Sequence, residues 1–315
     1  MQRVPAGTML IPMVIGALIA TVCRGLLGFD LWELLGTPMQ DMFSSSGQML
    51  LLGLMLFFTG TQLRLSDLKT AAGRGLRLIA VRLGTAYLLS ALYYFAFGYE
   101  GVCGISFLTL VCALTSCNAA LYLGIVSPMG DRADQASFGV MLVCSMPLLP
   151  LLFLGFFGPV GFGRAQVMQI VSQLIPFVLG VVLGNLDRDI RAVFSGGNAI
   201  IMPFLGFEFG SAIDLAACLR LLPQGLLLTA VYLVVVIVPS WLYERRRLKR
   251  PGYVSVASAC VAGVALTIPP LAAKADPSLG VYADTAVSVL AFVLAATDLL
   301  CPCLVKLSLK ILRKD

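Results

Sequence analysis

The residues with the clearest potential for chemistry form a short polar cluster inside an apolar stretch. Thr115, Ser116 and Asn118 interrupt the apolar run 102–126. A helix that only crosses lipid gains nothing from such side chains at mid-depth, whereas a helix that breaks there exposes backbone N–H and C=O groups to a cavity. The alternative is that these side chains hydrogen-bond neighbouring membrane helices. The cluster is therefore a candidate helix break and a candidate binding site.

A second candidate break lies in the segment 263–270. Pro269 and Pro270 both lack a backbone N–H, and two adjacent prolines do not fit the middle of a regular helix. With Gly263 and Thr267, this segment offers the same kind of site as the first break, and the alternative is a proline kink. Paired broken helices are typical of transport sites, and the N-terminus of a half-helix favours an anion.

Two acidic residues inside apolar stretches are candidates for carrying a proton. An ionised side chain at the bilayer centre costs about 2.5–3.5 kcal/mol on insertion scales, so each needs a reason. We place Glu208 first, between Phe207 and Phe209; the alternative is an ordinary buried, hydrogen-bonded acid. Asp298 comes second, because we expect it near the cytoplasmic end of its span, where Lys306 or Arg313 can pair with it.

Composition excludes several classes of protein. The chain has 315 residues, of which 59% are hydrophobic and 12% charged, so lipid must be its solvent. It has no His, and its nine Cys show no C-x-x-C spacing, so we predict no metal site and no cofactor. No nucleophile is paired with a base, which argues against an enzyme. The net charge of +6 resides in short loops and indicates no nucleic-acid partner.

The apolar segments predict ten transmembrane helices, each of about 20 residues, and therefore an all-α membrane protein. A possible short interfacial helix lies around residues 31–35. The fourth and ninth predicted helices contain the two breaks. The ten predicted spans are 9–22, 48–63, 78–97, 102–126, 136–157, 165–186, 199–215, 221–243, 254–275 and 281–304.

An internal repeat divides these helices into two sets of five. Residues 10–16 (LIPMVIG) and 174–180 (LIPFVLG) are identical at five of seven positions. A cleaved leader has no reason to resemble an internal span, so the first segment is not a signal peptide. An odd number of helices per copy forces the copies into opposite orientations. We therefore predict two inverted five-helix repeats, 1–160 and 161–315, intertwined into one unit.

The distribution of basic residues gives the orientation. With ten spans, 18 of the 22 Lys and Arg lie on the side of the termini, if Arg82 reaches that surface from the third span. The positive-inside rule then places both termini in the cytoplasm. We expect a multi-pass protein of the cell (inner) membrane, with lipid around it and with basic loops such as 244–250 near anionic headgroups.

Five stretches, spread over nearly the whole chain, carry a likeness to a known family. They are 3–7 with 10–12, 117–122 (CNAALY), 184–187 (GNLD), 209–215 and 272–277. Together they resemble the 2-keto-3-deoxygluconate permease family. The resemblance implies the fold of the bile acid, arsenite and riboflavin transporter superfamily, in which the broken fourth and ninth helices cross within a core domain and the remaining helices form a panel. It also implies proton-coupled import of a sugar acid.

The chain departs from the family pattern at positions that matter for binding and coupling. Ala119 and Ala120 stand where the family has a Gly pair, and Val264 stands where the second break has an Asn. Residues 144–147 (CSMP) replace a segment with an Asn-Asp pair, so a carboxylate is missing there. The substrate of the family therefore does not transfer automatically.

Together these features predict a secondary active transporter of a small organic anion, as a proton-coupled symporter of a sugar acid. The alternative is a facilitator or efflux carrier of a different carboxylate on the same fold, without proton coupling. The sequence gives no signal of oligomeric state. The predicted substrate-binding residues are Thr115, Ser116, Asn118, Gly263 and Thr267, and the predicted proton carriers are Glu208 and Asp298.

Overall fold

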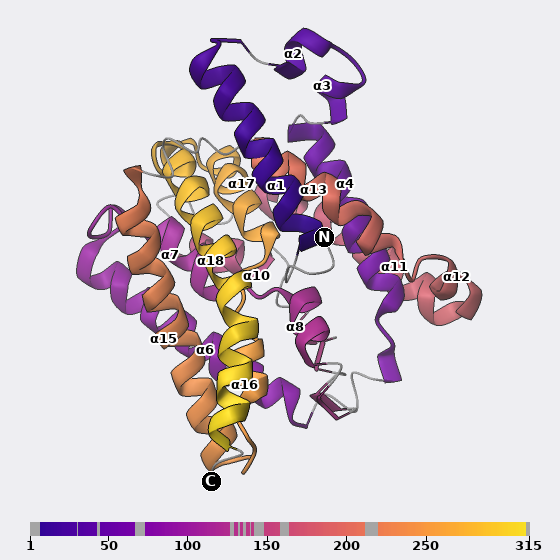
Figure 1. Cartoon of the computed structure of the whole chain (residues 1–315), viewed down its shortest axis with the longest axis vertical. Coiled ribbons are helices and arrows are strands. Elements are labelled where there is room, and N and C mark those ends of the chain that lie inside the picture. The colour runs from indigo at the N-terminus through magenta and orange to yellow at the C-terminus, as the bar shows by residue number, and fades with distance from the viewer. Residues whose placement is uncertain are drawn as a thin grey trace. The chain divides into compact units, whose positions relative to one another are not determined.

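The computed structural model describes residues 7–29, 31–42, 45–66, 73–126, 129–131, 133–134, 137–138, 140–141, 148–157, 164–211 and 220–312. In these ranges the regular structure is helical, apart from one isolated bridge between Val102 and Ile105. The chain forms two compact units (Figure 1): the first is Met1–Leu65 with Arg164–Arg220, and the second is Ser66–Gly163 with Leu221–Asp315. Each unit combines segments from both predicted repeats, so the units are not the repeats themselves.

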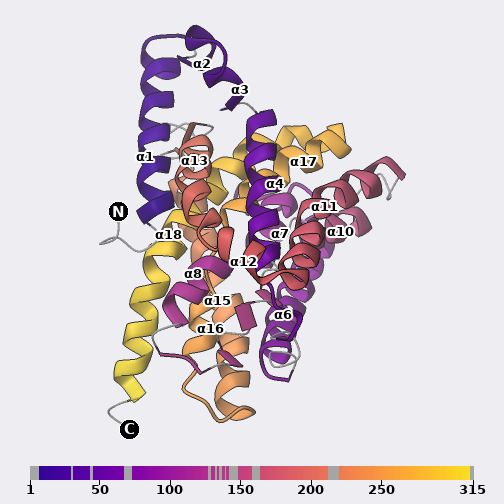
Figure 2. The ribbon, with the colours of Figure 1, turned by 90° about the vertical axis from the view of Figure 1, so that its right-hand side faces the viewer.

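The first unit is built on two helix pairs, in which α1 packs against α13 and α4 packs against α11 (Figure 2). The helix α2 coincides with the short helix predicted around residue 33. The described elements are α1 (Gly7–Ala20), the π-helical turn η1 (Thr21–Leu26), α2 (Leu31–Leu35), α3 (Met39–Met42), α4 (Ser45–Gln62), α11 (Arg164–Leu186), α12 (Arg188–Val193) and α13 (Gly197–Ser211).

Glycines bring the backbones of both pairs into direct contact. A Cβ atom on Gly16 of α1 would clash with the carbonyl of Phe207, and a Cβ on Gly210 of α13 would clash with the carbonyl of Met13. Close approach through small residues is how membrane helices associate when no water drives them together.

The α4·α11 pair repeats this contact at related positions. A Cβ on Gly180 would clash with the carbonyl of Phe57, and a Cβ on Gly60 would clash with the carbonyl of Phe177. Gly180 and Phe177 lie 164 residues after Gly16 and Met13, the spacing of the sequence repeat. The two helix pairs therefore use matching residues of the two predicted repeats.

We expect Gly60→Ala to destabilise the first unit, by about 1–3 kcal/mol, because backbone cannot move away from the added methyl group. Gly53→Ala in the same helix is the matched control, since a Cβ there meets only Pro176 at 3.8 Å. The measurement is thermal unfolding of the purified protein in detergent. Equal unfolding temperatures for the two variants would contradict the close contact.

The second unit surrounds α7, whose nine residues are all buried. This helix contacts α6, α10, α15, α17 and α18. Among the described residues this unit holds four helices besides the broken ones, so the remaining helices do not all form a separate panel, contrary to our expectation. Its elements are α6 (Gly75–Phe97), α7 (Phe107–Thr115), α8 (Ala119–Val126), α10 (Leu148–Phe157), α15 (Leu222–Arg246), α16 (Tyr253–Ala257), the 3₁₀ helices η2 (Gly263–Thr267) and η3 (Pro277–Leu279), α17 (Ile268–Ala275) and α18 (Gly280–Leu312).

The helices α6 and α15 bury matching faces. Every residue buried in α6 has a buried counterpart in α15 exactly 150 positions later. Nine of the twenty positions 75–94 are also identical in 225–244. At one buried position the types differ sharply, with Arg82 in α6 and Tyr232 in α15. The six pairs are Gly75/Gly225, Leu78/Leu228, Ile79/Thr229, Arg82/Tyr232, Ala86/Val236 and Ser90/Ser240.

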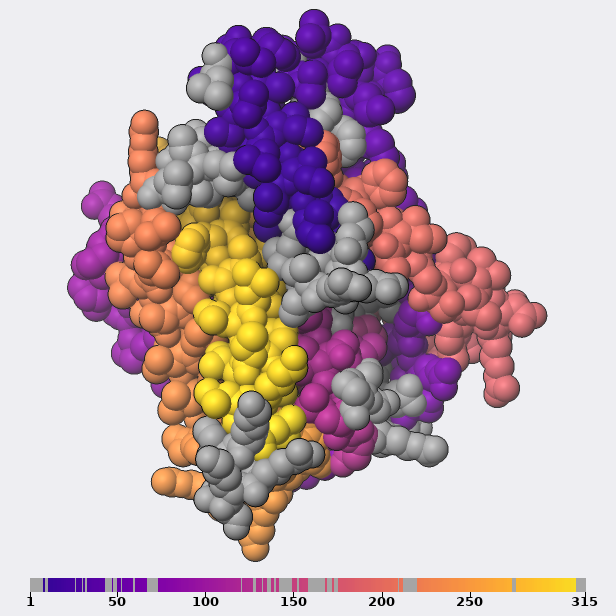
Figure 3. Space-filling view, viewed as in Figure 1, coloured from indigo at the N-terminus to yellow at the C-terminus, as the bar shows by residue number. Residues whose placement is uncertain are grey.

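Three helices within the described residues are long and apolar enough to cross a membrane: Gly75–Phe97, Leu222–Arg246 and Pro277–Leu309. Side chains of the last of these helices run down the face shown in Figure 3. The exposed apolar residues of this helix include Leu299, Leu300 and Leu307. Such a surface suits hydrocarbon. The fold is thus all-helical, as predicted, while the arrangement of ten spans in inverted repeats remains a prediction.

Candidate functional site

The first helix break lies within the polar cluster of the sequence. The helix α7 ends at Thr115, Ser116 is extended (φ −74°, ψ 145°), and α8 begins at Ala119. The Thr115 hydroxyl donates to the carbonyl of Val111 in its own helix, at 2.7 Å. The side chains of Ser116 and Asn118 are therefore the polar groups that accompany the exposed backbone.

The second break lies several residues earlier than expected, at 258–262 between α16 and η2. Pro269 and Pro270, which we expected to interrupt the helix, instead lie in the first turn of α17, where the missing N–H groups have no partner to lose. Gly263 begins η2, and the Thr267 hydroxyl donates to the carbonyl of Val264 at 2.8 Å. The predicted residues thus border the break on one side.

The two breaks bind each other in antiparallel fashion. The backbone N–H of Asn118 donates to the carbonyl of Cys260 at 2.8 Å, and the N–H of Ala262 donates to the hydroxyl oxygen of Ser116 at 2.9 Å. The N–H of Val261 donates to the hydroxyl of Thr297 in α18, at 3.1 Å. Backbone groups that neither broken helix can satisfy alone are thus satisfied across the crossing.

Asn118 connects the crossing to a buried acid. Its Oδ1 accepts from the N–H of Leu121 at 3.1 Å, which caps α8. Its Nδ2 donates to Oδ2 of Asp298 at 3.3 Å. The other carboxyl oxygen of Asp298 is buried and has no hydrogen-bond partner among the described residues. One amide side chain therefore positions the half-helix and contacts the acid.

The position of Asp298 corrects our expectation. We placed it near the cytoplasmic end, paired with Lys306 or Arg313; Arg313 lies outside the described residues, and the described part shows no ion pair to Lys306. Asp298 is instead fully buried beside the first break. Glu208, our first choice, is buried in α13 of the other unit. Asp298 thus lies at the crossing within the second unit.

Arg82 was missed as a site residue, because we expected it to reach the membrane surface. Its side chain is only 1% exposed. The guanidinium donates to the carbonyl oxygen of Ser116 and, at 3.2 Å, to the hydroxyl of Tyr232. The Tyr232 hydroxyl donates to the same Ser116 carbonyl at 3.3 Å. A permanent positive charge therefore lies at the first break.

An ion-pair cluster holds one end of the broken helices. Arg74, before α6, pairs with Asp131 at 2.6 Å, and Arg250, before α16, pairs with Asp131 at 2.9 Å and also with Asp134. Tyr253 of α16 donates to Asp134 at 2.6 Å. Partial burial raises the pKa of Asp131, but bonds from Arg74 and the Asp134 N–H outweigh this, so its pKa is lowered. Arg250 thus holds loops together rather than only setting topology.

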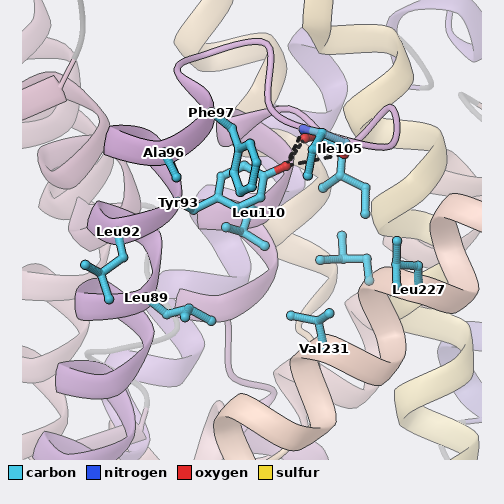
Figure 4. Close-up of a pocket in the computed structure, with 11 residues that line it drawn as sticks. Leu89, Leu92, Tyr93, Ala96, Phe97, Ile105, Leu110, Leu227 and Val231 are labelled. Atoms are coloured by element: carbon cyan, nitrogen blue, oxygen red, sulfur yellow. Dashed lines mark hydrogen bonds between the residues drawn. The ribbon is translucent and has the colours of Figure 1, made fainter.

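A groove of about 440 Å³ between α6, α7 and α15 is separate from the crossing (Figure 4). Its lining is apolar apart from Tyr93, whose hydroxyl accepts from the N–H of Val102 at 2.8 Å and donates to the carbonyl of Ile105 at 2.6 Å. It contains none of the predicted site residues, and its chemistry suits hydrocarbon rather than an anion. In the described part of the chain, no three His, Cys, Asp or Glu side chains gather to hold a metal ion.

Comparison with known proteins agrees with the resemblance in the sequence. The family described as 2-keto-3-deoxygluconate permease matches residues 1–314. A protein of that name from Tolumonas auensis is 29% identical over 96% of this chain and 89% of its own length. Another from Xanthomonas axonopodis pv. citri is 30% identical, over 97% and 95%, and one from Bacillus subtilis is 28% identical, over 96% and 90%. The chain therefore belongs to the 2-keto-3-deoxygluconate permease family.

Proposed function

We propose that this chain is a secondary active transporter that carries a sugar acid of the 2-keto-3-deoxygluconate type together with a proton. As a member of a permease family it is a membrane-embedded transporter and not an enzyme. The substrate class is supported by the names of the relatives. The observation that carries the proposal is the crossing itself, where two broken helices meet beside a buried acid and a buried cation.

The substrate binds at the crossing in this proposal. Ser116 and Asn118 supply polar side chains, and the N-terminus of α8 directs backbone N–H groups and a positive dipole toward a carboxylate. Gly263, the first residue of η2, borders the second break. Thr115 and Thr267 use their hydroxyl protons within their own helices, so they offer the substrate acceptor oxygens only.

Asp298 is the proton carrier in this proposal, ahead of Glu208. Its contact with Asn118 supports this order, because an amide that binds substrate then also senses the protonation of the acid. Glu208 stays the second candidate, since a buried acid in a predicted span also needs a reason.

The architecture in this proposal is ten spans in two inverted repeats, 1–160 and 161–315, with both termini in the cytoplasm and the protein in the inner membrane. The matching faces of α6 and α15 support the repeat, as do the matching glycine contacts of the first unit. Alternating access then comes from movement of one unit against the other.

Uptake by purified protein in liposomes tests the function. We expect uptake of 2-keto-3-deoxygluconate, accumulation when an inward proton gradient is imposed, and no uptake of glucose, a neutral sugar. Equal uptake with and without the gradient would instead support the facilitator or efflux alternative. No transport or binding of any sugar acid in a panel would refute the proposal.

A further inference from the structure

Arg82 is a fixed charge in a place where charge is costly. It lies in α6, one of the helices that can cross a membrane, and is almost completely buried. A guanidinium does not lose its proton in a protein. Placing such a charge in a span is costly, so its presence needs a reason that packing alone does not give.

The hydrogen bonding of the crossing brings this charge to the break. In a symmetric antiparallel pair, the Asn118 N–H to Cys260 C=O bond would be matched by a bond from the Ala262 N–H to the Ser116 C=O. The Ala262 N–H instead donates to the Ser116 hydroxyl. The Ser116 carbonyl is therefore left to accept from Arg82 and Tyr232.

We propose that Arg82 is the positioning residue that makes the crossing select an anion, through its charge and its hold on the Ser116 carbonyl. This inference rests on the proposed function. It adds the residue that makes the site prefer a negatively charged substrate. Asp298 also contacts the break, through the side chain of Asn118. Arg82 and Asp298 thus both hydrogen-bond to the segment 116–118.

The pair also links anion binding to proton binding. An ionised Asp298 repels a substrate carboxylate that enters at the break, whereas the charge of Arg82 attracts it. Protonation of Asp298 removes this repulsion and leaves the attraction of Arg82 in place. Such electrostatic effects are large where water is excluded. Binding of the proton and binding of the anion are thermodynamically linked. If protonation of Asp298 raises the affinity for the anion by some factor, bound anion raises the affinity for the proton by the same factor.

Tyr232 provides a matched control that the chain itself supplies. It occupies the position of α15 equivalent to Arg82 and binds the same carbonyl, but it carries no charge. Removing its hydroxyl disturbs the same hydrogen bond without changing the charge of the crossing. A comparison of the two residues therefore separates the effect of charge from the effect of structure.

The experiment measures binding of 2-keto-3-deoxygluconate and of other sugar acids to Arg82→Gln, Arg82→Lys and Tyr232→Phe in the full-length protein. We expect Arg82→Gln to weaken binding of the acids at least about tenfold, or about 1.4 kcal/mol. Arg82→Lys should recover most of the affinity, and Tyr232→Phe should change it much less. Equal losses in Arg82→Gln and Tyr232→Phe, or no recovery in Arg82→Lys, would overturn the inference.

A second measurement needs no variant and so does not depend on whether Arg82→Gln folds. The wild-type protein should bind a sugar acid at least about tenfold more tightly than its uncharged amide. Equal affinity for the acid and the amide would overturn the role of Arg82 and leave the proposed substrate class in place. If the wild-type protein binds no sugar acid at all, the proposed function fails instead.

Discussion

Replacing Asn118 by alanine is expected to reduce sugar-acid uptake to background while leaving the amount of protein in the membrane close to wild type. The variant loses the cap on α8 and the hydrogen bond to Asp298. It keeps the backbone bond to Cys260, so the two breaks still meet. A lost cap costs about 1 kcal/mol, which is too little to remove the fold but enough to release the half-helix at the binding site.

Asn185→Ala is the matched control for this variant. The Asn185 side chain makes three hydrogen bonds, to the carbonyls of Leu63 and Val181 and from the N–H of Leu65, whereas that of Asn118 makes two, and Asn185 lies in the first unit. Both variants should lose stability, and only Asn118→Ala should lose stabilisation by substrate in a thermal unfolding assay, since a ligand that binds the native state raises its stability. Normal uptake by Asn118→Ala would remove this residue from the site.

The first break could be predicted from the sequence because its signal is local. Thr115, Ser116 and Asn118 are polar residues in an apolar run, and α7 ends at the first of them. The second break carries no such signal, because residues 259–262 are small and apolar. They lie outside any helix, where Cys260 and Ala262 pair with the first break, which is a tertiary effect. The prolines were misleading, since a helix tolerates them in its first turn.

Arg82 and Asp298 were misplaced for a shared physical reason. Counting basic residues by the positive-inside rule treats every Arg as a surface residue. The burial of an acid in a long helix depends on which other helices pack against it, and the sequence alone does not give that packing. A usable signal was nevertheless present. The segments 75–94 and 225–244 repeat each other, and Arg82 corresponds to the uncharged Tyr232, so the repeat singles out Arg82 as a candidate site residue.

The division of the chain into two units could not be predicted from the sequence either, although the sequence does show the repeat. The repeat of residues 10–16 at 174–180 identifies which helices are related, but not which helices pack together. Packing follows from glycines: Gly16 and Gly180 each contact a helix of the opposite predicted repeat. Contacts between the two predicted repeats hold each unit together, and they become visible only when the backbone positions are known.

Replacing Asp298 by asparagine is expected to abolish proton-driven accumulation while leaving exchange of substrate across the membrane. Asparagine has nearly the same shape as the protonated acid and is likewise uncharged, so the variant still binds an anion but has no proton to release. With one proton per substrate, the wild-type protein should accumulate the sugar acid about tenfold per pH unit of gradient. The variant should only equilibrate it, in proteoliposomes assayed for uptake and for counterflow.

The pH dependence of binding makes this prediction sharper. In the wild-type protein, substrate affinity should fall as the pH rises and Asp298 loses its proton, because an ionised acid repels the substrate carboxylate. In Asp298→Asn the affinity should stay at the low-pH level throughout. Glu208→Gln is the control, and it should leave both accumulation and the pH dependence intact. If Glu208→Gln loses accumulation while Asp298→Asn retains it, the proton is carried in the first unit, and the coupling must then pass between the units rather than through Asn118.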